Sequence, residues 1–531
     1  MKNSTRFILF IAIILGSWST QAQDPNIIWQ NNIGGNADDD ANSIIQNTVG
    51  NYVIMATSRS DATGDKDEDS QGSEDYWVLE LDPEGNILWQ NTIGGDRADG
   101  AMKILQTPDG GYFIAGTSNS FLSGDKTEDL IGGRDYWVLK LDSTGNIQWQ
   151  NTIGGDQFDF LRSAALASDG GYVLAGWSDS PIGFDKSESP RGGYDYWIVK
   201  LNSSGTVIWD RTIGGDQDDF AEDIFATSDN GFIVTGSSDS DVSGNKTQDN
   251  NGVTDYWIIK LNSSGSIQWQ QSIGGSGTNA ASSIVQNSDG DYLVGGFSTS
   301  GISGDKTEVS RGGFDYWVLK LDSSGDIIWD KTIGGNNDDF FRTLNTTSDG
   351  GVFIGGYTTS GLSGDKTENS VGGSFDMWGV KLASDGSFQW DETLGGTGFD
   401  FLYTSLENSE GNLILAGLST SGVSVDHDEP NLGGSDIWIL EYNNLLSVAD
   451  INSSMDLSLS PIPAESSLNI SLTDTNIESV SIYAIDGREL LQTKGDNQSS
   501  MSLNVELLPT GTYFIKVAAE GQVQVKRFIK L

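Results

Sequence analysis

Asp135–Gly155 reads DYWVLKLDSTGNIQWQNTIGG, and close copies of this stretch recur along the chain at a nearly constant interval. The pattern Trp-x-x-x-(Ile/Leu)-Gly-Gly begins at Trp29, Trp89, Trp149, Trp209, Trp269, Trp329 and Trp390. A second pattern, Asp-x-Trp, has its tryptophans at Trp77, Trp137, Trp197, Trp257, Trp317, Trp378 and Trp438. Both series have a spacing of 60 residues with a single interval of 61. A fixed period indicates a repeat architecture, in which each unit buries its hydrophobic face against its neighbours.

Each copy of the repeat reads as four short strands joined by turns. In the second copy the predicted strands are Ala101–Thr107, Tyr112–Ser118, Asp135–Asp142 and Asn146–Ile153. The third strand is apolar on both faces, so it needs sheets above and below it. The fourth alternates apolar and polar residues, as an outer strand does. Four-stranded units that pack face to face around an axis make a β-propeller.

The two ends of the repeat region indicate that the ring closes. Ile27–Ile33 is a lone copy of the fourth strand, and the last unit stops after its third strand, Asp436–Tyr442. The N-terminal strand can therefore complete the last unit. We predict an all-β fold in which residues 23–443 form a seven-bladed β-propeller with four-stranded blades. A β-solenoid is the alternative, but its coils are usually shorter and would not need a split unit.

The repeats resemble those of the seven-bladed bacterial β-propeller repeat family. The resemblance rests on segments such as Trp149–Gly155, Ser168–Tyr172 and Asp135–Asp142, and it covers about residues 26–443. It implies the propeller fold. It implies little about function, because similar repeats serve as general scaffolds.

The rhythm of the sequence changes after Tyr442. Residues 444–458 are polar and irregular, which predicts a linker. Residues 459–531 contain short predicted strands, and Asp486-Gly487 supplies a hairpin turn between two of them. We predict a small Ig-like β-sandwich for this segment.

This last segment resembles the C-terminal sorting domain of the type IX secretion system of Bacteroidetes-type bacteria. The matching pieces are Leu459–Ala464, Val480–Arg488, Leu508–Val517 and Lys526–Leu531, although Ile462 stands where the family usually has Asn. The resemblance implies that the type IX secretion machinery is a partner. It also implies export across the outer membrane, followed by release or attachment at the cell surface.

The N-terminus reads as a signal peptide over residues 1–22. Lys2 and Arg6 precede an apolar run from Phe7 to Gly16, and small and polar residues follow up to Ala22. This order predicts cleavage between Ala22 and Gln23. No long apolar stretch follows, so we expect no membrane span in the mature protein.

The charge of the chain limits its partners. The formal net charge is −46, with 75 acidic and 29 basic residues. Such a field repels nucleic acid and anionic membranes, while cations, basic proteins and neutral glycans stay open as partners. Solubility alone also explains an acidic surface. The chain has no cysteine, which excludes disulfides and thiolate chemistry.

A series of aspartates recurs in the loop that leads from one unit to the next. Six units carry Gly-Gly-x-x-x-Asp, and the aspartates are Asp39, Asp99, Asp159, Asp219, Asp339 and Asp400, with Asn279 in the remaining unit. They could ring the mouth of the channel on the face with the long loops and bind a cation or a polar ligand. The alternative is that each caps its own loop by accepting backbone N–H bonds.

Aromatic and acidic residues near these aspartates give two further candidates. Phe160, Phe220, Phe340 and Phe401 follow four of the aspartates and could stack on sugar rings, or could begin a core strand. The other long loop repeats Gly-Asp-Lys-x-Glu. In the first unit it carries Asp65, Asp67 and Asp69, alternating acids that suit calcium. Calcium is the one cofactor that the sequence suggests, and a solvated acidic loop is the alternative.

The sequence contains no recognisable catalytic set. His427 is the only histidine, so neither a Ser-His-Asp triad of a usual kind nor a His-rich metal site stands out. We therefore predict a secreted or surface-displayed propeller that binds or adheres to a glycan or a protein. The alternatives are a carboxylate-based polysaccharide hydrolase or lyase, and a structural surface component without a discrete ligand.

Overall fold

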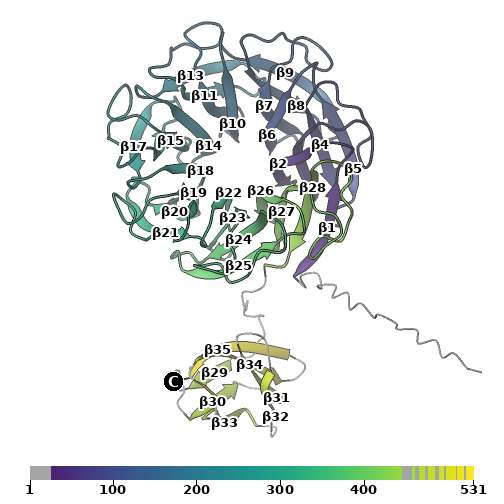
Figure 1. The fold of residues 1–531 in the computed structure, drawn as a ribbon, viewed down its shortest axis with the longest axis vertical. Coiled ribbons are helices and arrows are strands. Elements are labelled where there is room, and N and C mark those ends of the chain that lie inside the picture. Colours follow the sequence, from purple (N-terminus) through teal and green to yellow (C-terminus); the bar gives the residue numbers. More distant parts are fainter. Residues whose placement is uncertain are drawn as a thin grey trace, which may run out of the picture. The chain divides into compact units, whose positions relative to one another are not determined.

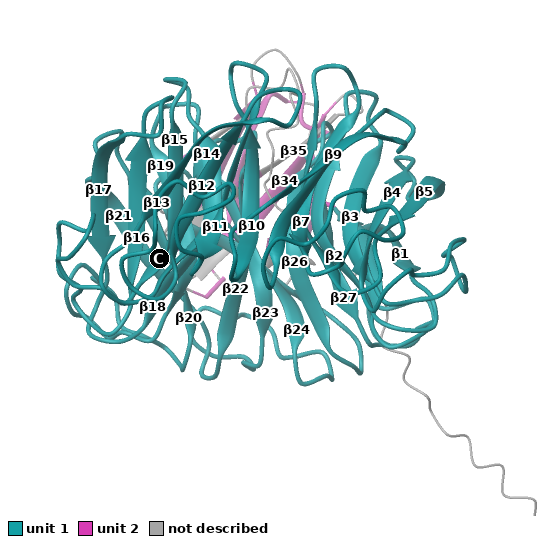
Figure 2. Cartoon of the chain, turned by 90° about the horizontal axis from the view of Figure 1, so that it is seen from above, with its two compact units in different colours: residues 1–442 teal, residues 443–531 magenta. Residues whose placement is uncertain are grey.

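The computed structural model describes residues 26–444, 457–460, 466–472, 476–484, 489–495, 498–506, 508–509, 511–519 and 522–530. The chain divides into two compact units, Met1–Tyr442 and Asn443–Leu531 (Figures 1 and 2). The predicted signal peptide, its cleavage site at Ala22 and Gln23, and most of the predicted linker lie outside the described residues. The described residues form β-strands and no helix that could cross a membrane.

In the first unit, the described strands form seven four-stranded antiparallel sheets, which we number in chain order. Sheet 1 contains β2 (Asp39–Gln46), β3 (Tyr52–Ser58), β4 (Asp75–Leu81) and β5 (Ile87–Ile93), and sheet 2 contains β6 (Asp99–Gln106), β7 (Tyr112–Ser118), β8 (Asp135–Leu141) and β9 (Ile147–Ile153). Sheet 3 contains β10 (Asp159–Leu166), β11 (Tyr172–Ser178), β12 (Asp195–Leu201) and β13 (Val207–Ile213), and sheet 4 contains β14 (Asp219–Ala226), β15 (Phe232–Ser238), β16 (Asp255–Leu261) and β17 (Ile267–Ile273). Sheet 5 contains β18 (Asn279–Gln286), β19 (Tyr292–Ser298), β20 (Asp315–Leu321) and β21 (Ile327–Ile333), and sheet 6 contains β22 (Asp339–Thr346), β23 (Val352–Thr358), β24 (Asp376–Leu382) and β25 (Phe388–Leu394). Figure 1 shows the sheets arranged radially around a central opening, with the first strand of each sheet innermost.

Sheet 7 joins the two ends of the repeat region. It contains β26 (Asp400–Glu407), β27 (Leu413–Ser419), β28 (Asp436–Tyr442) and, as its outer strand, β1 (Ile27–Ile33). β1 pairs antiparallel with β28, and Ile33 lies opposite Ile437. The predicted pairing of the N-terminal strand with the third strand of the last unit is therefore confirmed.

The core of this unit lies between neighbouring sheets. The tryptophan of each third strand, such as Trp137 in β8, is fully buried, and the third strands are buried on both faces as predicted. The hydroxyl of Tyr76 in sheet 1 donates to the carbonyl of Trp137 in sheet 2 at 3.2 Å. Four further sheet boundaries repeat this bond, from Tyr136, Tyr196, Tyr256 and Tyr316. Each buried aromatic side chain contributes about 1.5–3 kcal/mol through apolar burial.

Glycine is needed where one sheet touches the turn of the next. Gly145 has a φ of +85°, and a Cβ there would lie 2.6 Å from the ring of Trp89 in the preceding sheet. Gly116 in β7 would bring a Cβ to 2.5 Å from the Tyr76 hydroxyl. The small residues of the repeat thus let the sheets pack closely near the axis.

The second unit consists of two sheets around one hydrophobic core. One sheet has the order β29-β30-β33 and the other the order β32-β31-β34-β35. Leu468 and Ile470 of the first sheet share a core cluster with Val480, Ile482 and Ile515 of the second. The strands are β29 (Leu457–Ser460), β30 (Ser467–Leu472), β31 (Ser479–Ala484), β32 (Glu489–Lys494), β33 (Ser500–Asn504), β34 (Gly511–Ala519) and β35 (Gln522–Lys530).

Candidate functional site

The long loops of the repeat all leave the sheets at one end, which we call the long-loop face. They connect the second strand of a sheet to its third, and the last strand of a sheet to the first strand of the next, as residues 119–134 and 94–98 do. The turns at the opposite end are short. Surface loops on a rigid scaffold are where proteins most often carry binding residues.

Groups of aromatic side chains that contact one another lie on the long-loop face in five of the seven sheets, while sheet 2 has the single exposed ring of Phe121 there. We name two groups by their ring contacts. The first aromatic arc consists of Phe158, Phe160, Trp177, Tyr194 and Phe220. The second aromatic arc consists of Phe297, Phe314, Phe340, Tyr357, Phe375, Phe399, Phe401 and Tyr403. All of these side chains are partly exposed or exposed.

The first aromatic arc spans sheets 3 and 4. The ring centroids of Phe160 and Trp177 are 3.9 Å apart, and Tyr194 lies 4.7 Å from Trp177 with its ring edge-on. Phe220 of the next sheet is 5.3 Å from Trp177. The guanidinium of Arg134 lies 5.4 Å from the centre of the Phe160 ring, within reach of a cation–π contact.

The second aromatic arc runs across sheets 5, 6 and 7. Phe314 contacts Phe340 at 5.4 Å, and Tyr357 contacts Phe401 at 4.4 Å, so rings of one sheet pack on rings of the next. Arg342 donates to the Tyr357 hydroxyl at 3.0 Å. Burial raises the pKa of Tyr403 to about 12, which keeps its hydroxyl protonated as a donor.

These aromatic residues are not required by the repeat. Trp177 and Tyr357 occupy a position that holds Thr57 in sheet 1 and Thr117 in sheet 2, and the paired strands have the same register in all four sheets. Since the sheet forms equally well with threonine, packing of the fold does not explain the tryptophan or the tyrosine. A partly exposed aromatic cluster of this kind is typical of a binding surface.

The arcs border a central channel. The first strands of the seven sheets line a cavity of about 1080 Å³, and its wall includes Tyr403 of the second arc and Arg342, which lies beside that ring. Elsewhere in the wall, Arg162 pairs with Glu222 at 2.7 Å. The cavity is in the size range of ligand sites.

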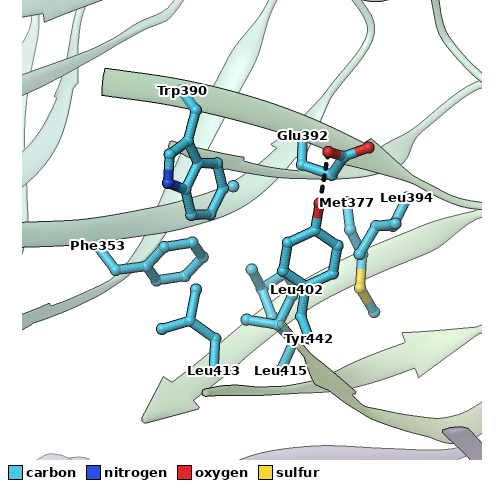
Figure 3. A pocket seen from close by; sticks show the side chains of 10 residues that line it. Phe353, Met377, Trp390, Glu392, Leu394, Leu402, Leu413, Leu415 and Tyr442 are labelled. Atoms are coloured by element: carbon cyan, nitrogen blue, oxygen red, sulfur yellow. Dashed lines mark hydrogen bonds between the residues drawn. The ribbon is translucent and has the colours of Figure 1, made fainter. Parts of the chain in front are cut away.

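A smaller cavity between sheets 6 and 7 has room for at most one water molecule. It measures about 10 Å³, and Figure 3 shows Phe353, Met377 and Tyr442 among the side chains around it, with a hydrogen bond from the Tyr442 hydroxyl to Glu392 at 2.6 Å. Gly379 stands where β8 and β20 have valine, and a Cβ at Gly379 would lie 2.8 Å from the Phe353 ring. This cavity is a packing feature and not a ligand site.

The six aspartates predicted from the sequence do not line the surface. Asp39, Asp99, Asp159, Asp219, Asp339 and Asp400 are completely buried at the starts of the innermost strands. Oδ2 of Asp99 accepts hydrogen bonds from the Gly95 N–H at 2.7 Å and from the Ser120 hydroxyl at 2.9 Å, and the other five repeat this pattern. These are the contacts of loop caps, and ligand binding at the six aspartates stays a prediction.

The three calcium candidates are also engaged within their loop. Asp65 accepts from the Gly34 N–H at 3.2 Å, and Asp69 accepts from the Ala62 N–H at 2.9 Å. The Asp67 side chain is exposed. Within the described ranges, no three acidic or histidine side chains lie close enough to hold a metal ion. The structure thus does not bring these three carboxylates together.

The lysine of the Gly-Asp-Lys-x-Glu loop lies in the interior. Lys126 is 1% exposed and its ammonium lies 5.2 Å from the centre of the Trp137 ring. Lys66, Lys186, Lys246, Lys306 and Lys366 are buried in the same way, and His427 takes this place in sheet 7. The loop motif therefore anchors the loop to the third strand.

Exposed aliphatic side chains lie at the tips of the loops that connect the second strand of a sheet to its third. Leu122 is 63% exposed, and five other sheets carry an equivalent residue: Ile182, Val242, Ile302, Leu362 and Val423. Sheet 1 has Ala62 at this position. Loop packing does not bury these side chains, so they are available for contact with a partner.

Comparison with known proteins covers both units. Residues 458–531 match the family described as secretion system C-terminal sorting domain. This domain indicates type IX secretion to the cell surface or the extracellular space, so the predicted sorting domain and location are confirmed. The regulatory protein FlaEY of Caulobacter vibrioides is 22% identical over 417 residues, a match that spans 72% of this chain and 43% of FlaEY.

Two solved structures are among those similar to this chain. The Pan2 WD40 domain of Neurospora crassa has 10% sequence identity and a TM-score of 0.41, covering 80% of this chain and 98% of the WD40 domain. A protein of unknown function from Dyadobacter fermentans has 12% identity and a TM-score of 0.38, covering 79% of this chain and all of that chain.

Proposed function

We propose that the exported protein is a seven-bladed β-propeller that binds an extracellular glycan on its long-loop face, at the two aromatic arcs. In this proposal the signal peptide, residues 1–22, is removed on export, and residues 459–531 act as the Ig-like sorting domain. The repeats are assigned to the seven-bladed bacterial propeller family on their sequence pattern.

The observation that carries the proposal is the asymmetry of the long-loop face. Seven copies of one repeat present the same three positions around the channel; sheets 3 and 6 have aromatic rings at all three, sheet 5 at two, sheets 4 and 7 at one, and sheets 1 and 2 at none. Sheets 1 and 2 have Asp40, Thr57, Glu74, Gly100, Thr117 and Arg134 there. A structural requirement would affect all copies equally, whereas a ligand needs contacts on one side of the ring.

A glycan fits the chemistry of the arcs. Sugar rings present apolar C–H faces that pack on aromatic rings, and hydroxyls that need donors and acceptors. The arcs supply the rings, and Arg342, Tyr357 and Tyr403 supply polar groups among them. A neutral glycan also escapes the repulsion that a net charge of −46 exerts on anions.

A glycan array and a protein array, probed with the mature secreted protein, test this proposal. We expect binding to a restricted set of glycans, and weaker binding by Trp177→Thr, which copies the residue of sheets 1 and 2. Phe388→Ile is the matched control, because Phe388 is an exposed aromatic residue outside the arcs and β9 has Ile147 in its place. Binding that Trp177→Thr leaves unchanged would contradict the proposal.

A protein partner is the second candidate, favoured by the ring of exposed aliphatic loop tips. Six such residues on one face add apolar area outside the arcs, and a flat protein surface could contact several at once. Protein hits on the array that weaken in Leu122→Ser and Ile302→Ser, with glycan spots empty, would favour this function. Turnover of a polysaccharide panel would instead indicate an enzyme.

A further inference from the structure

Each boundary between neighbouring sheets brings two buried side chains together. Asp75 begins β4 of sheet 1 and Asp99 begins β6 of sheet 2, and neither is exposed to solvent. The residues just before them, Glu74 and Ala98, form a parallel β-bridge, and the Asp99 N–H donates to the Glu74 carbonyl at 2.7 Å. The two aspartates therefore lie side by side. The corresponding pairs are Asp135 with Asp159, Asp195 with Asp219, Asp315 with Asp339, Asp376 with Asp400, and Asp436 with Asp39.

The seventh boundary shows what such a pair requires. There Asn279 replaces the second aspartate, and its backbone N–H makes the same bond to the carbonyl before Asp255. The side-chain Nδ2 of Asn279 donates to Oδ1 of Asp255 at 3.2 Å. Asn279 thus supplies a donor across the boundary to the carboxylate.

The six aspartate pairs have no such donor. In three of them, the pairs of Asp39, Asp99 and Asp219, Oδ1 of both members is buried and no donor among the described residues reaches it with hydrogen-bond geometry, although Ser58, Ser118 and Ser238 interact with the second member. In the pair of Asp159 this is true of Asp159 alone, because Oδ1 of Asp135 accepts from the Gly132 N–H at 3.3 Å. In the other two, the same is true of Asp315 and Asp376, while Asp339 and Asp400 bind Thr358 and Ser419. A buried carboxylate oxygen without a donor, beside a second buried carboxylate, is strongly unfavourable.

We infer that each of the six pairs binds one proton, which the two carboxyl groups share, so that a carboxylic acid donates across the boundary where the amide of Asn279 donates at the seventh. The pairs then form a belt of acid–carboxylate hydrogen bonds that join sheet to sheet around the ring.

The charges around the belt support this inference. A buried lysine lies between successive pairs: Lys66 interacts with Asp39 and Asp75, and Lys126 with Asp99 and Asp135. Thirteen aspartates face six such lysines and His427. Six shared protons leave seven negative charges against six positive ones, whereas full ionisation would leave thirteen.

The groups that face the pair of Asp75 and Asp99 are few. Lys66 and Lys126 lie on either side, and the Tyr76 phenol interacts with Asp99. The loop acids beside the two lysines are Asp61, Glu68, Glu128 and Asp129. Burial raises the pKa of Asp75 to about 6, and the backbone N–H groups of residues 71 and 72 and Lys66 oppose this rise only in part.

The pairs make stability depend on pH in a definite direction. Burial likewise raises the pKa of Asp135, Asp195, Asp339 and Asp436 to about 6, from an ordinary value of 3.8. At pH values between these two pKa values, the folded protein therefore holds more protons than the unfolded chain. Its stabilisation is complete below about pH 4 and is lost as the pH rises through about 6.

Two variants and two measurements test the inference on the mature protein. Asp99→Asn copies the natural Asn279 boundary, and Asn279→Asp creates a seventh pair. Infrared spectra in D₂O at a pD of about 5, between the ordinary and the raised pKa values, should contain a carboxylic-acid carbonyl band, which loses the area of about one acid group in Asp99→Asn and gains about as much in Asn279→Asp. The number of protons released on unfolding between pH 4 and 6 should fall by about one in Asp99→Asn and rise by about one in Asn279→Asp.

Asp67→Asn is the control, since Asp67 is exposed, and it should change neither quantity. The inference is overturned if the carboxylic-acid band of the folded wild-type protein at this pD is no larger than that of the unfolded chain. It is also overturned if the band and the proton count stay the same in Asp99→Asn or, should that variant fail to fold, in Asn279→Asp.

Discussion

Arg342 donates to the hydroxyl of Tyr357 at 3.0 Å, and its guanidinium also lies 5.6 Å from the centre of the Tyr403 ring. The side chain is exposed, so the bond holds a cation among the rings at the border of the channel. Arg162, at the same position of sheet 3, instead pairs with Glu222. Two arginines at one repeat position therefore have different surroundings.

We predict that Arg342→Ser weakens glycan binding, because it removes a polar group beside the second arc and a contact that orders two of its rings. Serine is the residue of sheet 5 at this position, Ser282. Contacts of this kind contribute about 0.5–2 kcal/mol. Titration of the glycan identified on the array measures the effect, and Arg162→Ser provides the comparison. Equal losses in both variants would show that channel charge matters and the arc does not.

The packing of β1 on sheet 7 predicts that substitutions of two isoleucines in this strand change the free energy of unfolding very differently. Ile33 in β1 is 3% exposed and lies opposite Ile437, whereas Ile28 in the same strand is 53% exposed. Ile33→Ala should lower the free energy of unfolding by about 2–5 kcal/mol, as expected for a buried large-to-small change. Ile28→Ala should change it by less than about 0.5 kcal/mol. Denaturant unfolding checks both, and similar losses would contradict the tight packing of β1 on sheet 7.

The packing between sheets 6 and 7 predicts a compensating pair of substitutions. Gly379→Val alone should lower the free energy of unfolding by about 1–3 kcal/mol, because the new side chain meets the Phe353 ring. Adding Phe353→Val, the residue of β3 and β11 at this position, should recover most of the loss. Thermal unfolding of the single and double variants measures the coupling. A double variant no more stable than Gly379→Val would refute this account of the small cavity.

Calcium is expected to act on this protein mainly by screening. The sequence suggests a calcium site at Asp65, Asp67 and Asp69, but two of these carboxylates already accept backbone N–H bonds. We predict that calcium chloride and sodium chloride raise the melting temperature equally at matched ionic strength. A larger shift with calcium that Asp67→Asn abolishes would instead establish the metal site.

Much of the fold could be predicted from the sequence because the repeat carries it. Neighbouring residues and the repetition itself display three properties: the 60-residue period, the third strand around Trp137 that is apolar on both faces, and the split unit at Ile27–Ile33. Those predictions needed no knowledge of which sheet packs on which. The strand pairing β1 with β28 follows from them directly.

The candidate site was only partly predictable, because it depends on contacts between sheets. Phe160, Phe220, Phe340 and Phe401 were considered, with a core role as the alternative, and they lie partly exposed within the arcs. Trp177 and Tyr357 were missed. Their signal was available as a departure from threonine at one repeat position, but the ring contacts that give it meaning cross from one sheet to the next.

The burial of the charged side chains was also not predictable from the sequence. The loop lysine, as in Lys126, reads as a solvated residue beside acids, yet it packs over Trp137. The aspartate series reads equally as a ligand ring or as loop caps, and only the positions of Gly95 and Ser120 distinguish the two. Burial of charge depends on neighbours that are distant in the sequence.

The most direct test of the central claim is the affinity of the mature protein for its array-selected glycan, measured by titration calorimetry for the wild type, Trp177→Thr, Tyr357→Thr and Phe388→Ile. Loss of a stacking ring should cost about 1.4 kcal/mol or more, that is, at least a tenfold weaker affinity. The account predicts this loss in at least one of the two arc variants, with Phe388→Ile unchanged and all four proteins equally stable. Wild-type affinity in both arc variants would contradict a glycan site at the aromatic arcs.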